Sequence, residues 1–281
     1  MENLQAYREE CEKGAFGGTA AARLVGRERE TMIYDGPGWL GNAWRDVKCW
    51  AVKGGYEIDV PGIGDTWLTK DGGSIAIAPE PGAEEEMVVE VALGPPLILA
   101  LAHLDTWCLH GSAVALEDRA VLFLGESGQG KSTLARWLDR NSHQSLRRIG
   151  DDILPLAFSG GRLQLLPHFP QLKIAADKQP AAGWPEQIPV AEAYALARPN
   201  GEEGIAIKEL DAQDGALSLL RHTVAARLFP SELMARHFDF CVQAAGAIRI
   251  KELSYPLTPE ALPKVFKMLT LDIGTGPFAP E

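Results

Sequence analysis

The chain has 281 residues, enough for one large domain or two smaller ones, and its 46% hydrophobic content is that of an ordinary globular protein. The formal net charge of −11 argues against a nucleic acid or an acidic membrane surface as a partner, because both attract Lys and Arg. The composition therefore favours a globular protein without a nucleic acid or an acidic membrane as its partner.

The start of the chain and its cysteines favour a cytoplasmic location. Residues 1–5 lack the basic and apolar segments of a signal peptide, and the most apolar region, residues 87–108, is interrupted by charges and prolines. We therefore expect no transmembrane helix. The cysteines lack metal-site and C-x-x-C spacing, which favours reduced structural thiols. They are Cys11, Cys49, Cys108 and Cys241.

The N-terminal part predicts a helix followed by a small antiparallel β region, and we assign residues 1–86 to it. Residues 1 to about 25 look helical, with a glycine-rich break at 14–18. Short β-like pieces at 31–34, 56–60 and 74–78 then alternate with turn signals, including one at 35–38. The tryptophans of this region predict its core rather than a ligand site. They are Trp39, Trp44, Trp50 and Trp67.

The next segment leads into the most informative stretch of the sequence. Residues 87–93 predict a strand, and residues 96–107 predict a helix that begins at a proline, as helices often do. Residues 109–116 predict a strand that turns at 117–119 into a second, apolar strand at 121–124.

Residues 125–132 fit G-x-x-x-x-G-K-[ST], the pattern of a phosphate-binding P-loop. The glycines let successive backbone N–H groups point at one anion, Lys131 adds a charge for the β- and γ-phosphates, and Ser132 offers a hydroxyl to Mg²⁺. A strand before the loop and helical spacing after it supply the context that the motif requires. A glycine-rich turn that binds nothing is the alternative, but packing gives no reason for Lys131 and Ser132. The expected ATP-binding residues are Gly125, Glu126, Ser127, Gly128, Gln129, Gly130, Lys131, Ser132 and Thr133.

A pair of adjacent carboxylates, Asp151 and Asp152, follows between apolar residues at the edge of a predicted strand. Neighbouring residues of a strand point to opposite faces, so we expect distinct roles for the two. An exposed turn or a helix cap is the alternative for such a pair, but its position after a P-loop favours a functional site.

The rest of the chain completes an α/β pattern, and we assign residues 87–281 to one core with C-terminal helices. Strands are predicted at 163–166, 190–197, 204–210 and 247–253, and helices at 214–229, 230–244 and 259–269. The first of these helices would carry its apolar side chains on one face. They are Leu217, Leu220, Val224 and Leu228.

Three blocks together resemble the catalytic core of HPr kinase/phosphorylase: residues 109–114, the loop 125–132, and the Gly-Asp-Asp at 150–152. His110 lies fifteen residues before the first loop glycine, and the Asp pair lies about twenty residues after Lys131. The likeness is closest to the shorter HPr-kinase-like proteins, which include kinases of lasso-peptide and related biosynthetic clusters and kinases that act on free serine. It extends weakly to residues 170–173, 220–222 and 253–256, and so covers most of residues 88–270.

The resemblance implies an α/β fold with a P-loop HPr-kinase/PEP-carboxykinase-like core, and an enzyme that uses ATP and Mg²⁺. Asp151 would take the proton of an acceptor serine hydroxyl, with Lys131 at the phosphates and His110 beside Asp151 to orient it. Asp152 and Ser132 would hold Mg²⁺. The Glu-x-Arg-Gly signature of the full enzymes is missing after the Asp pair, which argues against the phosphorylase reaction and against HPr itself as the substrate.

Three functions remain open at this point. The chain is a kinase for a serine of a peptide or protein, a kinase for free serine or a similar small molecule, or a nucleotide-binding regulator. The Asp pair and His110 argue against a regulator, because mere binding needs no base.

By analogy with the hexamers of HPr kinases, we expect a homo-oligomer. Further candidates for phosphate or acceptor contacts, each with a structural role as the alternative, are His168, Lys173, Arg221, His222 and Arg227.

Overall fold

The computed structural model describes residues 19–40, 43–142, 146–169, 185–199 and 204–274. The chain forms two compact units, and each combines helices with strands, so the protein is of mixed α/β class. Unit 1 comprises Met1–Trp107 and Ala225–His237, and unit 2 comprises Cys108–Val224 and Phe238–Glu281. The part of the predicted N-terminal helix within residues 1–18 and the candidate Lys173 lie outside the described residues.

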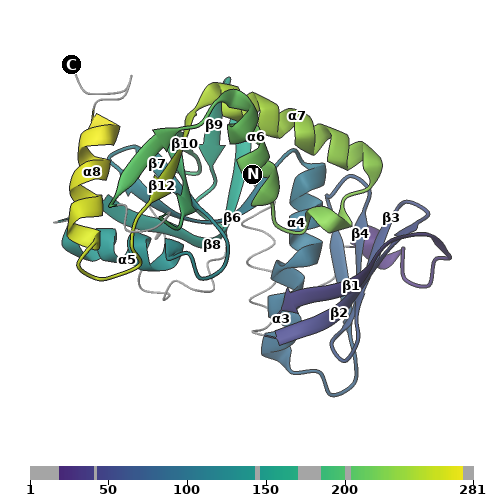
Figure 1. The fold of residues 1–281 in the computed structure, drawn as a ribbon. Helices are drawn as coiled ribbons and strands as arrows, with labels where there is room; N and C mark the ends of the chain where they lie inside the picture. The colour runs from purple at the N-terminus through teal and green to yellow at the C-terminus, as the bar shows by residue number, and fades with distance from the viewer. Residues whose placement is uncertain (1–18, 41–42, 143–145, 170–184, 200–203, 275–281) are drawn as a thin grey trace. The chain divides into compact units, whose positions relative to one another are not determined.

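The sheet of unit 1 is an antiparallel meander of five strands in sequence order (Figure 1). Its strands are β1 (Arg29–Leu40), β2 (Ala43–Val52), β3 (Gly55–Val60), β4 (Gly64–Thr69) and β5 (Ile75–Pro79). Its helical elements are α2 (Thr19–Ala22), α3 (Glu85–Leu93), α4 (Pro95–His103), the 3₁₀ turn η2 (Ala226–Leu228) and the first part of α7 (Ser231–Ala247). Helix α4 is apolar nearly all round, is buried from Pro96 to Ala102 and packs on β4 and β5.

The boundary between the two parts of the chain lies further along than the expected one at residue 86. Because α4 packs on the N-terminal sheet and α3 packs on α4, both helices belong to unit 1. The predicted strand at 87–93 is wrong, since these residues lie in α3. Glu85 and Glu86 occupy the first turn of α3, where negative charge favours the N-terminus of a helix.

The helical stretch Glu85–His103, which comprises α3 and α4, is long and apolar enough by length and composition to cross a membrane. It meets this criterion although the sequence led us to expect no transmembrane helix. Of its most apolar window, 61% is buried inside the protein. The core helices of many proteins pass the same test, so the finding does not by itself assign a membrane span.

Two of the four tryptophans expected in the core of unit 1 lie at its surface. Trp50 and Trp67 are buried, whereas Trp39 and Trp44 are 58% and 69% exposed and pair with each other across the β1–β2 hairpin. The predicted turn at 35–38 is also wrong, because these residues belong to β1. An edge strand such as β1 tolerates Pro37, which would be costly inside a sheet.

The sheet of unit 2 has seven strands in the order β11-β12-β10-β7-β6-β8-β9. Strands β7, β10 and β12 run parallel, while β6, β9 and β11 are antiparallel to β7, β8 and β12 respectively. Strand β9 also pairs with the start of β10, so the sheet curls back on itself. The strands are β6 (Trp107–Leu116), β7 (Arg119–Leu124), β8 (Leu146–Ser159), β9 (Arg162–Leu165), β10 (Ile188–Ala197), β11 (Ala206–Glu209) and β12 (Arg249–Ser254).

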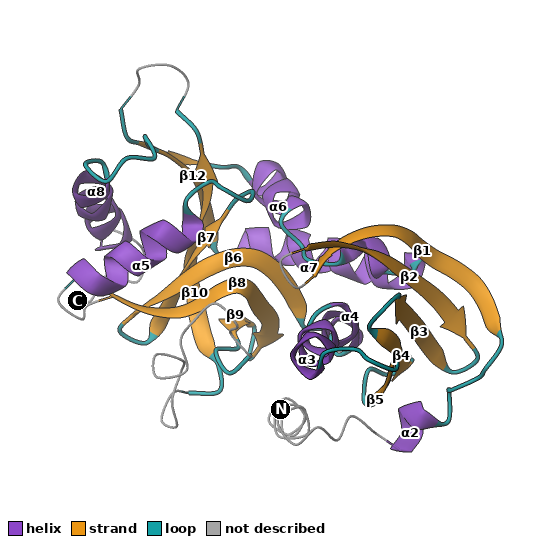
Figure 2. Ribbon diagram, turned by 90° about the horizontal axis from the view of Figure 1, so that it is seen from below, coloured by secondary structure: helices purple, strands orange, loops and turns teal. Residues whose placement is uncertain are grey.

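Helices cover both faces of this sheet (Figure 2). Helix α5 (Lys131–Asn141) and helix α8 (Leu262–Gly274) share a core with β7, β10 and β12, and the rings of Trp137 and Phe266 lie 6.0 Å apart between them. Helix α6 (Ala212–Arg221) covers the other face, where Gly215 approaches Ile250 of β12.

A largely buried ionic cluster connects α8 to the sheet. Asp272 accepts hydrogen bonds from Lys251 Nζ at 2.6 Å and from the Tyr194 hydroxyl at 2.5 Å. Both donors also contact Glu192, so Lys251 lies between two carboxylates. Because α8 packs on α5, this cluster also supports the helix that follows the 125–132 loop.

The predicted helix at 214–229 is too long, because the chain leaves the helix at Arg221. Residues 222–224 pair instead with the start of β6: Leu109 forms a bridge with Thr223, and the Val224 N–H donates to the Cys108 carbonyl at 2.8 Å. The apolar spacing that predicted the longer helix is therefore shared among α6, this short pairing and η2. Leu217 is 44% exposed rather than buried.

Candidate functional site

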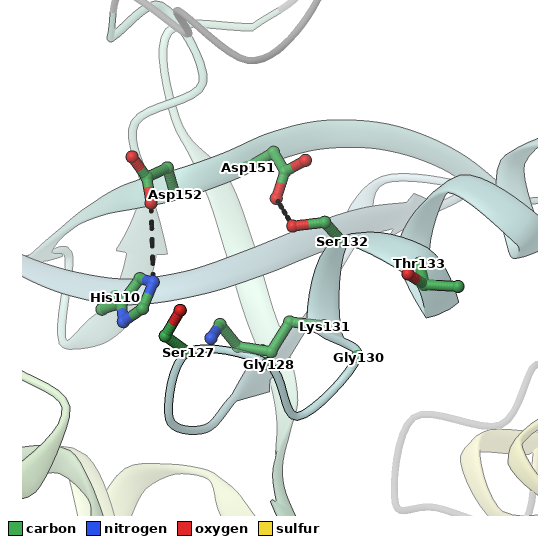
Figure 3. Close-up of a pocket in the computed structure, with 9 residues that line it drawn as sticks. All are labelled: His110, Ser127, Gly128, Gly130, Lys131, Ser132, Thr133, Asp151 and Asp152. Atoms are coloured by element: carbon green, nitrogen blue, oxygen red, sulfur yellow. Dashed lines mark hydrogen bonds and ion pairs between the residues drawn. The ribbon is translucent and has the colours of Figure 1, made fainter. Parts of the chain in front are cut away.

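One pocket of unit 2 is formed by the 125–132 loop, strand β6 and strand β8 (Figure 3). Every residue that lines it belongs to the set predicted from the sequence. These residues are His110, Ser127, Gly128, Gly130, Lys131, Ser132, Thr133, Asp151 and Asp152. The other three predicted residues, Gly125, Glu126 and Gln129, belong to the same loop without lining the pocket.

The loop begins where β7 ends at Leu124 and passes into α5 at Lys131. Gly130, at the N-cap of α5, has a left-handed backbone with φ of 86°, and Gly128 has φ of 82°, a conformation that favours glycine. A Cβ on Gly125 would lie 2.4 Å from Oε1 of Gln129. The path of the loop thus favours glycine at 128 and 130, and a side chain at 125 would displace that of Gln129.

The side chains of the loop satisfy its own backbone groups. Gln129 Oε1 accepts a hydrogen bond from the Glu126 N–H at 2.6 Å. Lys131 Nζ donates to the carbonyls of Gly125 and Glu126 at 2.7 and 2.9 Å, so the ammonium lies folded over the loop. Backbone N–H groups, an ammonium and a helix N-terminus gathered in this way are the usual donors to a phosphate.

Asp151 is a fully enclosed carboxylate at the centre of the pocket wall, with 1% of its surface exposed. Its Oδ1 accepts hydrogen bonds from Ser112 Oγ at 2.6 Å and from Ser132 Oγ at 2.7 Å. Its Oδ2 accepts one from Arg148 Nη1 at 3.2 Å. Asp151 therefore connects β6, β8 and the first turn of α5, and its orientation is fixed from three sides.

Asp152 lies at the open side of the pocket and is paired with His110. The distance from His110 Nε2 to Asp152 Oδ1 is 3.5 Å, and the two side chains are 35% and 39% exposed. The register places His110 there, because the next residue, Gly111, pairs with Leu124 at the end of β7. His110 therefore lies opposite the first residue of the loop.

This pairing differs from the expected one, in which His110 lay beside Asp151. The two carboxylates were also expected at the edge of a strand and on opposite faces, but β8 continues through both. Asp152 has φ of 92°, a left-handed backbone that interrupts the alternation of the strand, and both side chains line the same pocket. Such a conformation costs about 1–3 kcal/mol in a non-glycine residue and is concentrated at functional sites.

His222 does not line the pocket but holds the backbone of His110. Its carbonyl accepts a hydrogen bond from the His110 N–H at 2.7 Å. Burial lowers the pKa of the His222 imidazole to about 4; the Glu126 carboxylate raises this pKa and Lys131 lowers it. The imidazole is therefore neutral at pH 7.

The remaining candidate contacts do not line the pocket. Arg221 is an exposed residue at the end of α6, His168 is half-buried after β9, and Arg227 belongs to unit 1. These residues were predicted to contact phosphate or acceptor only because each carries a charged or imidazole side chain. Such side chains are equally common at surface and structural positions.

Two residues that contact Asp151 were not singled out by the sequence, Ser112 and Arg148. A signal for Ser112 existed, because it stands two residues after His110 on β6 and two such residues share a face of a strand. Arg148 belonged to a polar, basic stretch that resembled an ordinary surface segment, although its side chain is only 9% exposed.

No family model matches this chain, and no curated protein matches it in sequence. Among solved structures, it is similar to the HPr(Ser) kinase/phosphatase from Coxiella burnetii, with 15% sequence identity and a TM-score of 0.33. That alignment covers 59% of this chain and 88% of the other. The likeness to this kinase/phosphatase is therefore distant.

Proposed function

We propose that this chain is an ATP-dependent phosphotransferase that moves the γ-phosphate to a serine hydroxyl of a peptide or protein. One observation carries the proposal: a single pocket combines the 125–132 loop with two carboxylates in different environments, Asp151 against Ser132 and Asp152 against His110. Phosphoryl transfer requires neutralised phosphate charge, an aligned acceptor and a group that takes its proton. The likeness in motif spacing to HPr-kinase-like proteins supports the same reaction class.

The loop and Lys131 are the residues we propose for the phosphates. Lys131 Nζ would exchange the carbonyls of Gly125 and Glu126 for phosphate oxygens, which are stronger, charged acceptors. Helix α5 begins at Lys131 and points its positive end at the same place. The loop thus offers an ammonium, backbone N–H groups and a helix dipole to one polyphosphate.

Ser132 and Asp151 are the residues we propose for Mg²⁺. Their oxygen atoms lie 2.7 Å apart, and Mg²⁺ prefers oxygen ligands, commonly one or two carboxylates together with substrate phosphates. Such a site needs few protein ligands, which fits the finding that the described residues hold no group of three or more His, Cys, Asp or Glu suited to a metal. When bound there, Mg²⁺ would neutralise phosphate charge, while Ser112 and Arg148 hold the Asp151 carboxylate in place.

Asp152 is the residue we propose to take the proton of the acceptor hydroxyl. Its side chain is 39% exposed, and a substrate can reach it, whereas Asp151 is enclosed. His110, 3.5 Å away, would orient the Asp152 carboxylate. This assignment reverses the roles that the resemblance implied, in which Asp151 was the base and Asp152 the metal ligand.

Phosphorus NMR of the full chain with ATP, Mg²⁺ and serine-containing peptides tests the proposal. We expect a new phosphomonoester signal, which Asp152→Asn should reduce by a factor of about 10²–10⁴ without loss of ATP binding. Asp118→Asn is the matched control, because Asp118 is an exposed residue of the β6–β7 turn. Wild-type turnover in Asp152→Asn would contradict the proposed base.

Free L-serine in a parallel sample separates the two kinase functions. A phosphoserine signal with the free amino acid would move the acceptor class from peptides to small molecules. Intact ATP with every acceptor, in a protein shown to bind ATP, would replace the phosphotransferase by a nucleotide-binding regulator.

A further inference from the structure

We infer that the loop after β12 forms the surface on which the nucleoside of ATP rests, with Leu257 as its contact residue. The inference rests on the proposed function, because it assumes that the 125–132 loop holds a triphosphate. It adds a binding surface outside the residues that line the phosphate pocket.

The pocket has two distinct ends (Figure 3). His110 and Asp152 lie at one end, near Ser127, while Gly130 and Thr133 lie at the other. The phosphate that is transferred must lie beside the proposed base, Asp152. Because a triphosphate is a linear chain, its nucleoside has to leave the pocket at the opposite end, beside Gly130.

The loop after β12 lies at the Gly130 end of the pocket. Strands β7, β10 and β12 are parallel, so their carboxyl ends meet at one edge of the sheet, where ligands of α/β proteins usually bind. A Cβ on Gly130 would lie 3.1 Å from the Tyr255 hydroxyl and 3.0 Å from Leu257 Cδ2. Both residues therefore border the phosphate loop directly.

Tyr255 and Leu257 contribute differently. Tyr255 is 1% exposed and belongs to the core beneath α5 and α8, so it fixes the path of the loop. Leu257 is 47% exposed, although its Cδ2 lies beside Gly130, and its apolar surface is open to a ligand. A flat, largely apolar ring that covers this surface removes it from water, which favours binding.

The pocket itself lacks such a surface. The nine residues that line it are glycines or carry polar or charged side chains, which suit phosphates and a cation but offer no aliphatic contact to a base. Leu257 supplies the missing contact at the end where the nucleoside would emerge. The ligand group that would bind on this surface is therefore the base and ribose of a nucleoside triphosphate.

Binding of ATP and of inorganic tripolyphosphate to the full chain tests this inference by calorimetry. Leu257→Ala should raise the Kd for ATP about fivefold and leave the Kd for tripolyphosphate unchanged, because only ATP has a nucleoside. Leu257→Phe should keep or improve ATP affinity, since it restores an apolar surface. Leu271→Ala, which changes a 62% exposed leucine of α8, is the control and should alter neither Kd.

The outcomes separate this inference from the proposed function. If the wild-type chain binds both ligands and Leu257→Ala retains full ATP affinity, the nucleoside surface is wrong and the proposed function stands. Equal weakening of both ligands by Leu257→Ala would also overturn the inference, since it would report a disturbed phosphate loop. If the wild type binds neither ligand, the proposed function fails as well.

Discussion

His110 Nε2 and Asp152 Oδ1 lie 3.5 Å apart, while the neighbouring carboxylate, Asp151, is held by serine hydroxyls and an arginine. Two adjacent acidic residues thus have separate partners. Both side chains line the pocket, but Asp151 is 1% exposed and Asp152 is 39% exposed. Environments that differ in this way usually assign different roles to a pair of carboxylates.

Replacement of His110 should therefore reduce turnover more than binding. We expect His110→Ala to lower kcat about tenfold or more and to change the KM for ATP little, because His110 acts through Asp152 rather than on the nucleotide. His110→Gln should recover part of the rate, since a glutamine amide can still donate to Asp152. Steady-state kinetics of ATP turnover with a serine acceptor measures both. A raised KM with unchanged kcat would instead place His110 in substrate binding.

The hydroxyl of Ser132 should govern the requirement for Mg²⁺. Ser132→Ala removes an oxygen that lies 2.7 Å from Asp151 and that we propose as a ligand, so the Mg²⁺ concentration for half-maximal turnover should rise about tenfold. A Mg²⁺ titration at fixed ATP concentration gives this value. Ser159→Ala, at an exposed position near the end of β8, is the matched control. An unchanged Mg²⁺ requirement in Ser132→Ala would argue against the proposed metal site.

Arg148 should matter for stability as well as for the site. Arg148→Ala removes the guanidinium that pairs with the buried Asp151 carboxylate, and we expect a loss of roughly 3 kcal/mol in the free energy of unfolding, the usual effect of breaking a buried ion pair. Urea denaturation of both proteins measures the loss. Arg162→Ala, at an exposed position at the start of β9, is the control and should cost less than about 0.5 kcal/mol. Equal losses in the two variants would show that the Arg148–Asp151 pair adds nothing to stability.

The sequence predicted the parts of the site that depend on local pattern. The loop glycines, Lys131 and the strand before them have fixed spacing, which predicted the six lining residues that lie between 127 and 133. The other three, His110, Asp151 and Asp152, were predicted from the adjacent carboxylates and from the three-block resemblance. The pairing within the site was not predictable, because it follows from the left-handed backbone of Asp152, which strand alternation does not anticipate. Arg148 was overlooked for a related reason: its burial depends on how β8 packs against α5 rather than on its neighbours in the sequence.

The errors in the fold have the same origin. Apolar residues 87–93 suit a strand or a helix equally, and contact with α4 favours the helix. Trp39 and Trp44 suit a core or a hairpin surface, and their position on the outer hairpin of the sheet leaves both exposed. In both cases the tertiary environment, rather than the intrinsic preference of the segment, determines the structure.

Protonation of buried histidines should limit the stability of the protein in mild acid. His237 is fully buried in unit 1, with its ring 5.0 Å from Trp107 and 5.6 Å from Phe229. Burial lowers its pKa to about 4, whereas the unfolded chain has a value of about 6.5. Below pH 6.5 the unfolded state binds a proton that the folded state does not. The contribution of His237 to the free energy of unfolding is therefore fully present above pH 6.5 and is lost as the pH falls towards 4.

The expected loss for His237 between pH 7.5 and pH 5 is about 2 kcal/mol, and His222, whose pKa is lowered in the same way, adds to the total. His237→Phe should remove the first contribution, because phenylalanine fills the site between the two rings without a titratable group. Urea denaturation of both proteins at the two pH values measures the difference. If His237→Phe loses as much stability on acidification as the wild type, the imidazole of His237 is not the group that titrates.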